Sequence, residues 1–318
     1  MKKTLATFLF CAVTCLNALA FPDKPVTIVV PFPAGGSTDS IARALAPKLQ
    51  EKLGGSFIVD NRAGATGTIG AASVKRSAPD GYTLLVTSLG PLVIAPHLIK
   101  GVQYDALKDF DPITIAVQAP NVLVVPASSP FKTLADVIAQ QKKTPEKVTF
   151  ASSGNGSSDH LTLGLFMQQT GTTGIHVPYK GGSPAINDLL GSQVDASFQN
   201  INAVLQHINA GKLRALAVTS ARRSSVLPQV PTMKEAGVGG VEVASWQAMV
   251  APKGLPPEIK AKIHAAVVAA LQDDILRNKL LSQGFEIVAN TPEQFAQYQV
   301  SEFARWKKVI EVGKITAD

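Results

Sequence analysis

Apolar and polar positions fall into blocks along this chain, and the blocks predict buried strands that are each followed by an amphipathic helix. The block from Val26 to Leu53 shows this most clearly. Its first five residues are β-branched and four of them are apolar, which predicts a buried parallel strand. Pro31 and Pro33 end the strand, because proline cannot donate to a hydrogen-bond ladder. Apolar residues then recur at helical spacing, at Ile41, Ala42, Leu45, Ala46, Leu49 and Leu53.

The turn between this strand and helix is a candidate anion site. Gly35 and Gly36 allow a sharp turn and a close approach of another molecule. Ser37 or Thr38 is expected to cap the helix. Unpaired N–H groups at a helix N-terminus, beyond the carboxyl end of a strand, attract negative charge. An ordinary strand-to-helix connection would use the same residues, so this turn alone leaves both interpretations open.

The segment from Val148 to Gly171 has the same order of elements, a short apolar strand, a Gly/Ser turn and a helix. The tetrad at 36–39, Gly-Ser-Thr-Asp, corresponds to Gly-Ser-Ser-Asp at 156–159. The shared context of strand, turn and helix argues against a chance match. We therefore expect one anion-binding turn in each of two domains.

The remaining blocks predict further alternation of strands and helices, which favours α/β domains with mostly parallel sheets. Strands are predicted at 56–60, 82–87, 174–179, 194–200 and 213–219, and helices at 131–141, 185–190, 203–210, from 230 to 237, and from 256 onward. Thr291 and Gln294 form a capping box for a last helix. Segments 109–126 and 242–251 are predicted to cross between the domains. Two crossings make a hinge that allows closure around a ligand.

The first residues of the chain have the pattern of an export signal. Residues 1–20 have a basic start, an apolar stretch and an Ala-Leu-Ala end, typical of a secretory signal peptide cleaved after Ala20. Both cysteines, Cys11 and Cys15, lie in this segment, so the mature chain is expected to have no disulfide. No later run of residues is apolar enough for a membrane span. The predicted mature protein is periplasmic, with two domains in its length.

The sequence lacks the motifs of several classes of enzyme and metal-binding protein. The sequence contains no G-x-S-x-G elbow, P-loop or H-E-x-x-H motif, and none of its five histidines falls at metal-ligand spacing. A Ser157/His160 nucleophile and base lack an orienting acid, because Asp159 adjoins His160. Basic pairs such as Lys75-Arg76 are scattered, which argues against nucleic-acid binding.

Glycines 64, 67 and 70 resemble a dinucleotide fingerprint, but they do not occupy the first strand-to-helix turn. Close packing of a glycine-rich helix start on the sheet is the competing interpretation of these glycines. The predictions therefore include no metal, no cofactor and no nucleic-acid partner.

The motifs together resemble the tripartite tricarboxylate transporter receptors, the periplasmic TctC-like solute-binding proteins also called Bug proteins. The resemblance rests on the signal peptide and, in family order, on PFPAGGSTD, NRAGATGTIG, SSGNGSSDH, VPYKGG and QVPTMKEAG. It implies a type II periplasmic-binding-protein fold of the Venus-flytrap kind, with two α/β domains and two hinge crossings. The expected first domain comprises 21–121 and 243–318, and the second comprises 122–242.

The resemblance also implies that two loops, 32–39 and 152–160, hold one carboxylate through backbone amides and ordered water. Polar residues at predicted strand ends are added on position alone. The candidate ligand-binding residues are Phe32, Ala34, Gly35, Gly36, Ser37, Thr38, Asp39, Thr87, Ser88, Ser152, Ser153, Gly154, Gly156, Ser157, Ser158, His160, Tyr179, Gln199 and Asn200.

The function that the resemblance implies is a receptor that captures a small carboxylated metabolite and delivers it to membrane permease subunits. The receptor is expected to be a monomer. Two alternatives stay open from the sequence. A ligand sensor would use the same closure with a signalling partner instead of a permease, and a secreted hydrolase would turn its substrate over.

Overall fold

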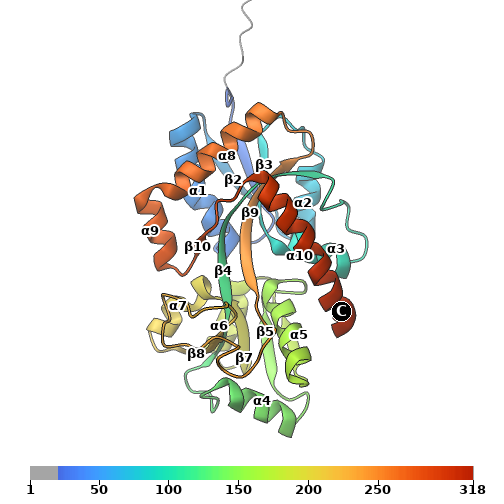
Figure 1. Ribbon diagram of the computed structural model, residues 1–318, viewed down its shortest axis with the longest axis vertical. Coiled ribbons are helices and arrows are strands. Elements are labelled where there is room, and N and C mark those ends of the chain that lie inside the picture. Colours follow the sequence, from blue (N-terminus) through green and yellow to red (C-terminus); the bar gives the residue numbers. More distant parts are fainter. Residues whose placement is uncertain (1–20, 318) are drawn as a thin grey trace, which may run out of the picture.

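The computed structural model describes residues 21–317, so the predicted signal peptide and both cysteines lie outside the described residues. Figure 1 shows two lobes, one built by the N- and C-terminal thirds of the chain and one by its centre. Two long strands, β4 (Phe110–Pro126) and β9 (Ala244–Pro252), run between the lobes. None of the helices in residues 21–317 has the length and apolar character needed to cross a membrane.

The first lobe holds the strand, turn and helix that the hydrophobic pattern predicts at 26–53. Apart from the crossing strands, the elements of this lobe are, in chain order, β1 (Val26–Val30), α1 (Ser37–Leu53), β2 (Phe57–Asn61), the 3₁₀ turn η1 (Ala65–Gly67), α2 (Thr68–Lys75), β3 (Thr83–Ser88), the π-helical turn η2 (Gly90–Ile94), α3 (Ala95–Leu98), α8 (Pro257–Gln272), α9 (Asp274–Ser282), β10 (Glu286–Ile287) and α10 (Pro292–Gly313). The predicted capping box of α10 is confirmed, because Thr291 and Gln294 each bond the other's backbone N–H.

The second lobe contains α4 (Leu134–Lys143), β5 (Thr149–Ser152), α5 (Ser158–Thr170), β6 (Ile175–Pro178), α6 (Gly182–Leu190), β7 (Ala196–Asn200), α7 (Ile201–Asn209) and β8 (Leu213–Val218). The helix expected at 230–237 is wrong, because that segment forms turns. Thr232 and Glu235 bond each other's backbone N–H, but Gly237 takes a φ of 90° before a helical ladder is established.

The sheets are mixed, which corrects the expectation of mostly parallel sheets. Parallel pairs occur within each lobe, where β1 lies between β2 and β3, and β5 between β6 and β7. The crossing strands are antiparallel to every neighbour, as are β8 and β10. The reason is that β4 leaves the first lobe in one direction while β9 returns in the other.

The strand β4 passes from one lobe to the other without a break. Its residue Pro120 pairs with Ala244 of β9, and the next residue, Asn121, pairs with Asn200 of β7. The segment predicted to cross at 109–126 is therefore one continuous strand. The exchange of partners at Asn121 marks the point where the first sheet gives way to the second.

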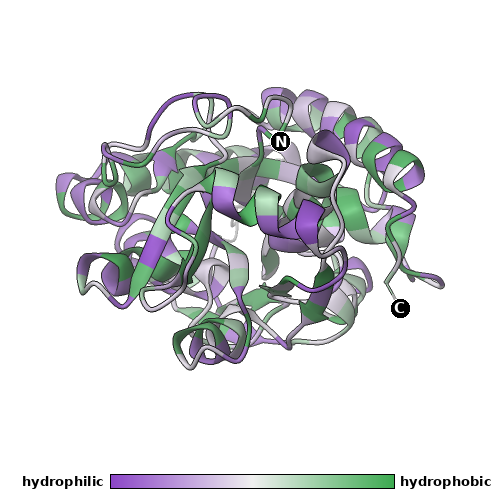
Figure 2. Cartoon of the chain, turned by 90° about the horizontal axis from the view of Figure 1, so that it is seen from below, coloured by the Kyte–Doolittle hydropathy of each residue, from purple (hydrophilic) through white to green (hydrophobic). Residues whose placement is uncertain are grey.

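Side chains along β1 alternate between the two faces of the sheet, and this alternation decides on which face the loop after β1 emerges. Val26, Ile28 and Val30 point into the core beneath α1 and α8, whereas Val29 points to the opposite face, toward α2, η2 and α10. The predicted stripe of α1 is buried from Ile41 to Leu49. Figure 2 shows hydrophobic residues on the strands and on the inner sides of the helices, with polar residues outside. The loop after β1 thereby emerges on the α1 face, toward the second lobe.

Candidate functional site

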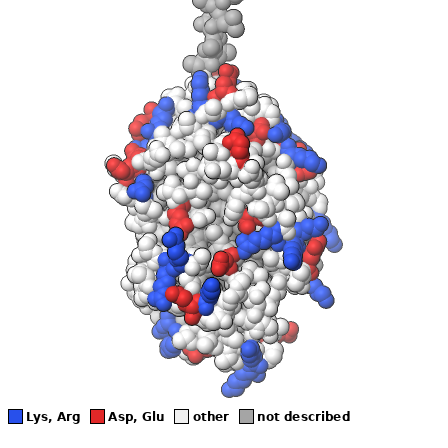
Figure 3. Space-filling model, viewed as in Figure 1, with Lys and Arg blue, Asp and Glu red and all other residues white. Residues whose placement is uncertain are grey.

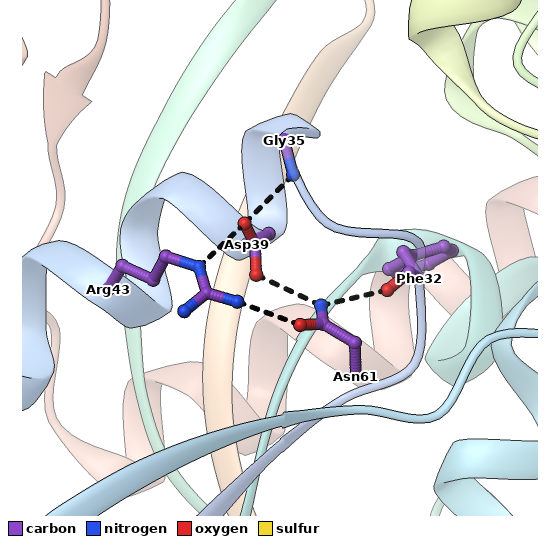
Figure 4. Close-up of polar contacts among 5 residues, drawn as sticks. All are labelled: Phe32, Gly35, Asp39, Arg43 and Asn61. Atoms are coloured by element: carbon purple, nitrogen blue, oxygen red, sulfur yellow. Dashed lines mark hydrogen bonds and ion pairs between the residues drawn. The ribbon is translucent and has the colours of Figure 1, made fainter.

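The loop after β1 is held by a buried carboxylate, that of Asp39, in the first turn of α1. Its Oδ2 accepts hydrogen bonds from the backbone N–H of Gly35 and from Arg43 Nε, both at 2.9 Å. Its Oδ1 accepts one from Asn61 Nδ2 at 2.9 Å, and the same amide group bonds the carbonyl of Phe32 at 3.0 Å. Figure 4 shows these contacts joining both ends of the loop to the helix. Asp39 therefore shapes the loop, with its carboxylate occupied by the protein itself.

The electrostatics keep Asp39 ionised. Burial disfavours its charged form, but the hydrogen bonds from Arg43, Gly35 and Asn61 and the charge of Arg43 together hold its pKa below the usual value. Arg43 lies on the outer side and is half exposed. The loop itself, residues 31–36, contains no arginine.

The helix α1 begins without a side-chain cap, so the expected cap at Ser37 or Thr38 is wrong. Gly36 is the N-cap, with φ −79° and ψ 172°, and no side chain bonds the first turn. The N–H groups of residues 36–39 find no acceptor within residues 21–317, while Gly35 N–H is taken by Asp39. Unpaired N–H groups at a helix N-terminus generally attract negative charge.

The loop after β5 satisfies most of its own donors. Asp159 Oδ2 accepts from Ser153 N–H at 2.7 Å, and Ser152 Oγ accepts from Gly154 N–H at 3.1 Å. His160 Nδ1 accepts from Gly156 N–H at 3.1 Å, and Ser157 caps α5 by accepting from His160 N–H. The two predicted turns thus share an aspartate that reaches back to the loop, but only the first leaves a continuous row of amides free.

The two aspartates also differ in charge environment. Burial raises the pKa of Asp159, and the hydrogen bonds from Ser153 and Ser158 only partly oppose that. No basic side chain forms an ion pair with Asp159 among the described residues. The two turns therefore carry their aspartates in different states. Asp39 in the first turn is held ionised, whereas the environment of Asp159 in the second turn favours the protonated carboxyl group.

A pair of stacked histidines lies beneath the second loop and was not anticipated from the sequence. The rings of His160 and His176 are 4.0 Å apart between centroids and 4° from parallel. His176 Nε2 lies 2.6 Å from Ser152 Oγ. Burial lowers the pKa of His160 to about 3 and that of His176 to about 4. The His160 ring accepts from the Gly156 N–H, and only the backbone N–H of His160 bonds the Ser157 hydroxyl, so the geometry gives no Ser157/His160 nucleophile-base pair.

Four contacts bring the two loops to the interface between the lobes. Asn202 Nδ2 donates to Ser37 Oγ at 3.2 Å, and Thr66 Oγ1 donates to the carbonyl of Asn155. A Cβ added to Gly90 would meet the carbonyl of Gly156 at 3.3 Å, and one added to Gly181 would meet Pro33 at 3.8 Å. The first loop therefore faces α6 and α7, while the second faces η1 and η2.

The remaining candidates divide between the interface and the interior. Gln199 Oε1 and Ser153 Oγ lie on the same side of Gly182, and Asn200 Nδ2 donates to Ser158 Oγ at 3.2 Å. The Tyr179 hydroxyl points away, donating to Asp188 at 2.6 Å. Thr87 is fully buried and points to the opposite sheet face from Ser88.

The glycines at 67 and 70 pack against the first loop, as the competing interpretation expects, whereas a Cβ on Gly64 would meet the Ile69 side chain at 2.6 Å. A Cβ on Gly70 would lie 2.8 Å from the Pro31 backbone, and one on Gly67 would lie 3.2 Å from the Phe32 ring. Their spacing thus reflects close packing beside β1.

Charged groups offer no other site. Basic and acidic side chains are interspersed over the face seen in Figure 3. Within residues 21–317, histidines and acids form no cluster of three that suits a metal ion.

The chain matches known receptors over almost its whole described length. Residues 41–314 match the model of the tripartite tricarboxylate transporter family receptor. Protein BugT of Bordetella pertussis is 41% identical over 296 residues, covering 93% of this chain and 91% of that protein.

Solved structures of receptors are also similar to this chain. Rpa4515 of R. palustris with adipate has a TM-score of 0.90 and 37% identity, covering 93% of this chain and 99% of its own. MatC (Rpa3494) of Rhodopseudomonas palustris with bound malate has a TM-score of 0.87 and 33% identity, covering 91% of this chain and 100% of its own. The chain belongs to the tripartite tricarboxylate transporter receptor family and is, like the Bug proteins, a periplasmic solute-binding receptor and not an enzyme.

Proposed function

We propose that this receptor captures a small carboxylated metabolite between its lobes and delivers it to a tripartite tricarboxylate-type permease. The observation that carries the proposal is the row of N–H groups at 36–39, which lack acceptors within residues 21–317 and face the second lobe. Backbone donors at a helix N-terminus suit a carboxylate without an arginine. Relatives solved with adipate and malate support the same ligand class.

The proposed binding site consists of the first loop, the second loop and the polar ends of β3 and β7. The second loop would contribute the free N–H of Asn155 or Ser158 and ordered water, because the N–H groups of Ser153, Gly154, Gly156, Ser157 and His160 are internally bonded. Ser88, Gln199 and Asn200 are kept as candidates. Thr87 and the Tyr179 hydroxyl are weaker ones, since the structure directs them elsewhere.

Closure is proposed to occur about β4 and β9, with domains of 21–121 plus 243–318 and of 122–242, in the type II manner. Support comes from the change of strand partner between Pro120 and Asn121. The receptor is proposed to act as a monomer after export and cleavage behind Ala20.

Native mass spectrometry of the receptor purified from periplasm tests this proposal. A retained small molecule should be released on denaturation and should carry one or more carboxyl groups. Re-addition of that molecule to the emptied receptor should restore the mass shift. A neutral or cationic retained molecule would refute carboxylate capture while leaving the receptor role intact.

A further inference from the structure

The last helix of the first lobe, α10, ends against the second lobe. Figure 1 shows its C-terminal end beside α5, the helix that follows the second loop, residues 152–160. Gln168 of α5 donates from Nε2 to the carbonyl of Val309 near the end of α10, at 3.1 Å. Phe166 of α5 and Ile310 of α10 belong to one core cluster. The helix α10 thereby joins the two lobes by side-chain contacts, in addition to the crossing strands.

Two glycines allow this close approach of α10 and α5. A Cβ added to Gly164, in the middle of α5, would lie 2.5 Å from Ile315 Cδ1, and one added to Gly313, the last residue of α10, would overlap the Gln168 side chain. Glycine in a helix interior is less favourable than alanine, so Gly164 weakens α5 as an isolated helix. What the missing side chain provides is room for Ile315 of the other lobe.

The residues after α10 turn back and reach the second loop. Lys314 has a left-handed φ of 49°, and the N–H of Ile315 bonds back to a carbonyl of α10 at 3.1 Å, as in a Schellman helix end. The carbonyl of Ala317 then accepts a hydrogen bond from Asn155 Nδ2. The backbone carbonyl of Asn155 accepts from Thr66 Oγ1 of the first lobe. Asn155 is therefore held by two separate segments of the first lobe.

We propose that the segment from Lys314 to Ala317 is a strap that positions the second loop against the first lobe and favours the closed form. The inference rests on the proposed function, because it assigns the strap to closure about β4 and β9. The second loop has its own internal hydrogen bonds, so the strap sets its place relative to the first lobe and not its shape. Opening the lobes separates Ile315 from α5 and breaks the bond to Asn155, so both contacts stabilise the closed form.

Calorimetric titration with adipate and with malate tests the contribution to closure. Ile315→Ala should bind the acid about five-fold more weakly than the wild type, and a chain that ends at Gly313 about ten-fold more weakly, because less of the receptor is closed. Val312→Ala is the matched control, since this β-branched residue in the last turn of α10 is 66% exposed, and it should bind as the wild type does. Wild-type affinity in both the truncated chain and Ile315→Ala would overturn the strap.

Gly164→Leu separates the strap from overall stability. Leucine is a better helix former than glycine, but its side chain would occupy the place of Ile315 on α5. The melting temperature without ligand should therefore not fall, while the affinity for the acid falls about five-fold. Combining it with Ile315→Ala should weaken binding no further, because both changes act on one contact. A loss of affinity only in proportion to a lower melting temperature would show a purely structural role, against the inference.

Amide hydrogen exchange without ligand decides the positioning role independently of the proposed function. In the chain that ends at Gly313, the N–H groups of residues 152–160 should exchange about five-fold faster than in the wild type, because the loop loses its bond at Asn155. The helix α4, at the far end of the second lobe, should exchange at the wild-type rate (Figure 1). Unchanged exchange in the loop would overturn the strap. If the wild type binds neither acid, carboxylate capture is in question, and the exchange measurement alone decides the strap.

Discussion

Ser37 and Asn202 are hydrogen-bonded through their side chains, although they lie 165 positions apart and in different lobes. Ser37 is the first residue of α1 and Asn202 lies in the first turn of α7. The bond therefore joins the helix N-terminus that carries the free amides to the opposing lobe. A contact of this kind is present only when the lobes are together, so it favours the closed form.

Asn202→Ala should weaken ligand binding by shifting the receptor toward its open form. Loss of one hydrogen bond across the interface corresponds to an affinity decrease of about three- to ten-fold. Calorimetric titration with whichever of adipate and malate binds more tightly measures it. The control is Asn209→Ala, an exposed residue at the other end of α7, which should have no effect. Equal affinities for both variants would show that the bridge does not contribute to closure.

Gly36→Val should abolish binding while leaving the receptor folded. The backbone at Gly36 has φ −79°, and an added Cβ meets only the Pro33 carbonyl, at 3.7 Å, so the fold tolerates a side chain. The valine would stand where a carboxylate approaches the amides, and we expect more than about a hundred-fold loss. Gly154 is a poor probe, because its φ of +122° and a 2.8 Å contact with the Tyr179 carbonyl strain any side chain.

Gly239→Val is the control for that experiment, since it has open space around it and no positive φ. Circular dichroism should show both variants folded. If Gly36→Val keeps wild-type affinity, the amides of the first loop are not the carboxylate site.

Asp39→Asn should destabilise the receptor more than Asp159→Asn. The charge of Asp39 is matched by Arg43, and its pKa is held low, so neutralising it removes about 1–2 kcal/mol from the free energy of unfolding. Asp159 has a raised pKa and no basic partner among the described residues, so a neutral amide of the same shape should cost less than about 1 kcal/mol. Urea unfolding at pH 7 compares them, and the reverse order would contradict the charge assignment.

Acidification should destabilise the receptor through His160 and His176. Their pKa values in the folded receptor, about 3 and about 4, lie below the ordinary 6.5. The unfolded chain therefore takes up protons first as the pH falls, so stability is full above about pH 6.5 and is lost down to about pH 4. Each ring contributes about 1.4 kcal/mol per pH unit in that window.

His176→Gln should flatten this dependence, measured as the free energy of urea unfolding between pH 7 and 4.5. A slope in His176→Gln equal to that of the wild type would remove the stacked pair as its source.

The sequence predicted the local units well because each depends on neighbouring residues. The β-branched run at 26–30, the prolines behind it and the helical stripe from Ile41 to Leu49 determine one strand, turn and helix. The capping box at Thr291 and Gln294 is equally local. By contrast, the sequence does not distinguish which hydroxyl or glycine begins α1, since Gly36, Ser37 and Thr38 are all acceptable N-caps.

Contacts between distant segments were beyond prediction from the sequence. His176 lies 16 positions from its stacking partner, on a strand whose pairing brings it beneath α5. Thr66 reaches Asn155 only because two left-handed residues, Ala65 and Thr66, turn its side chain toward the other lobe. Ile315 follows the last turn of α10, and no local pattern indicates its contact in the other lobe. These are properties of the assembled lobes.

Recognition of negative charge by the first loop is tested by one comparison. Purified mature receptor is titrated calorimetrically with its retained or best-bound acid, and then with the amide in which each carboxylate is replaced by a neutral carboxamide of nearly the same shape. We expect one site per chain for the acid and no measurable heat for the amide, because the N–H row at 36–39 has only donors to offer. Equal affinity for acid and amide would show that the first loop does not recognise a carboxylate.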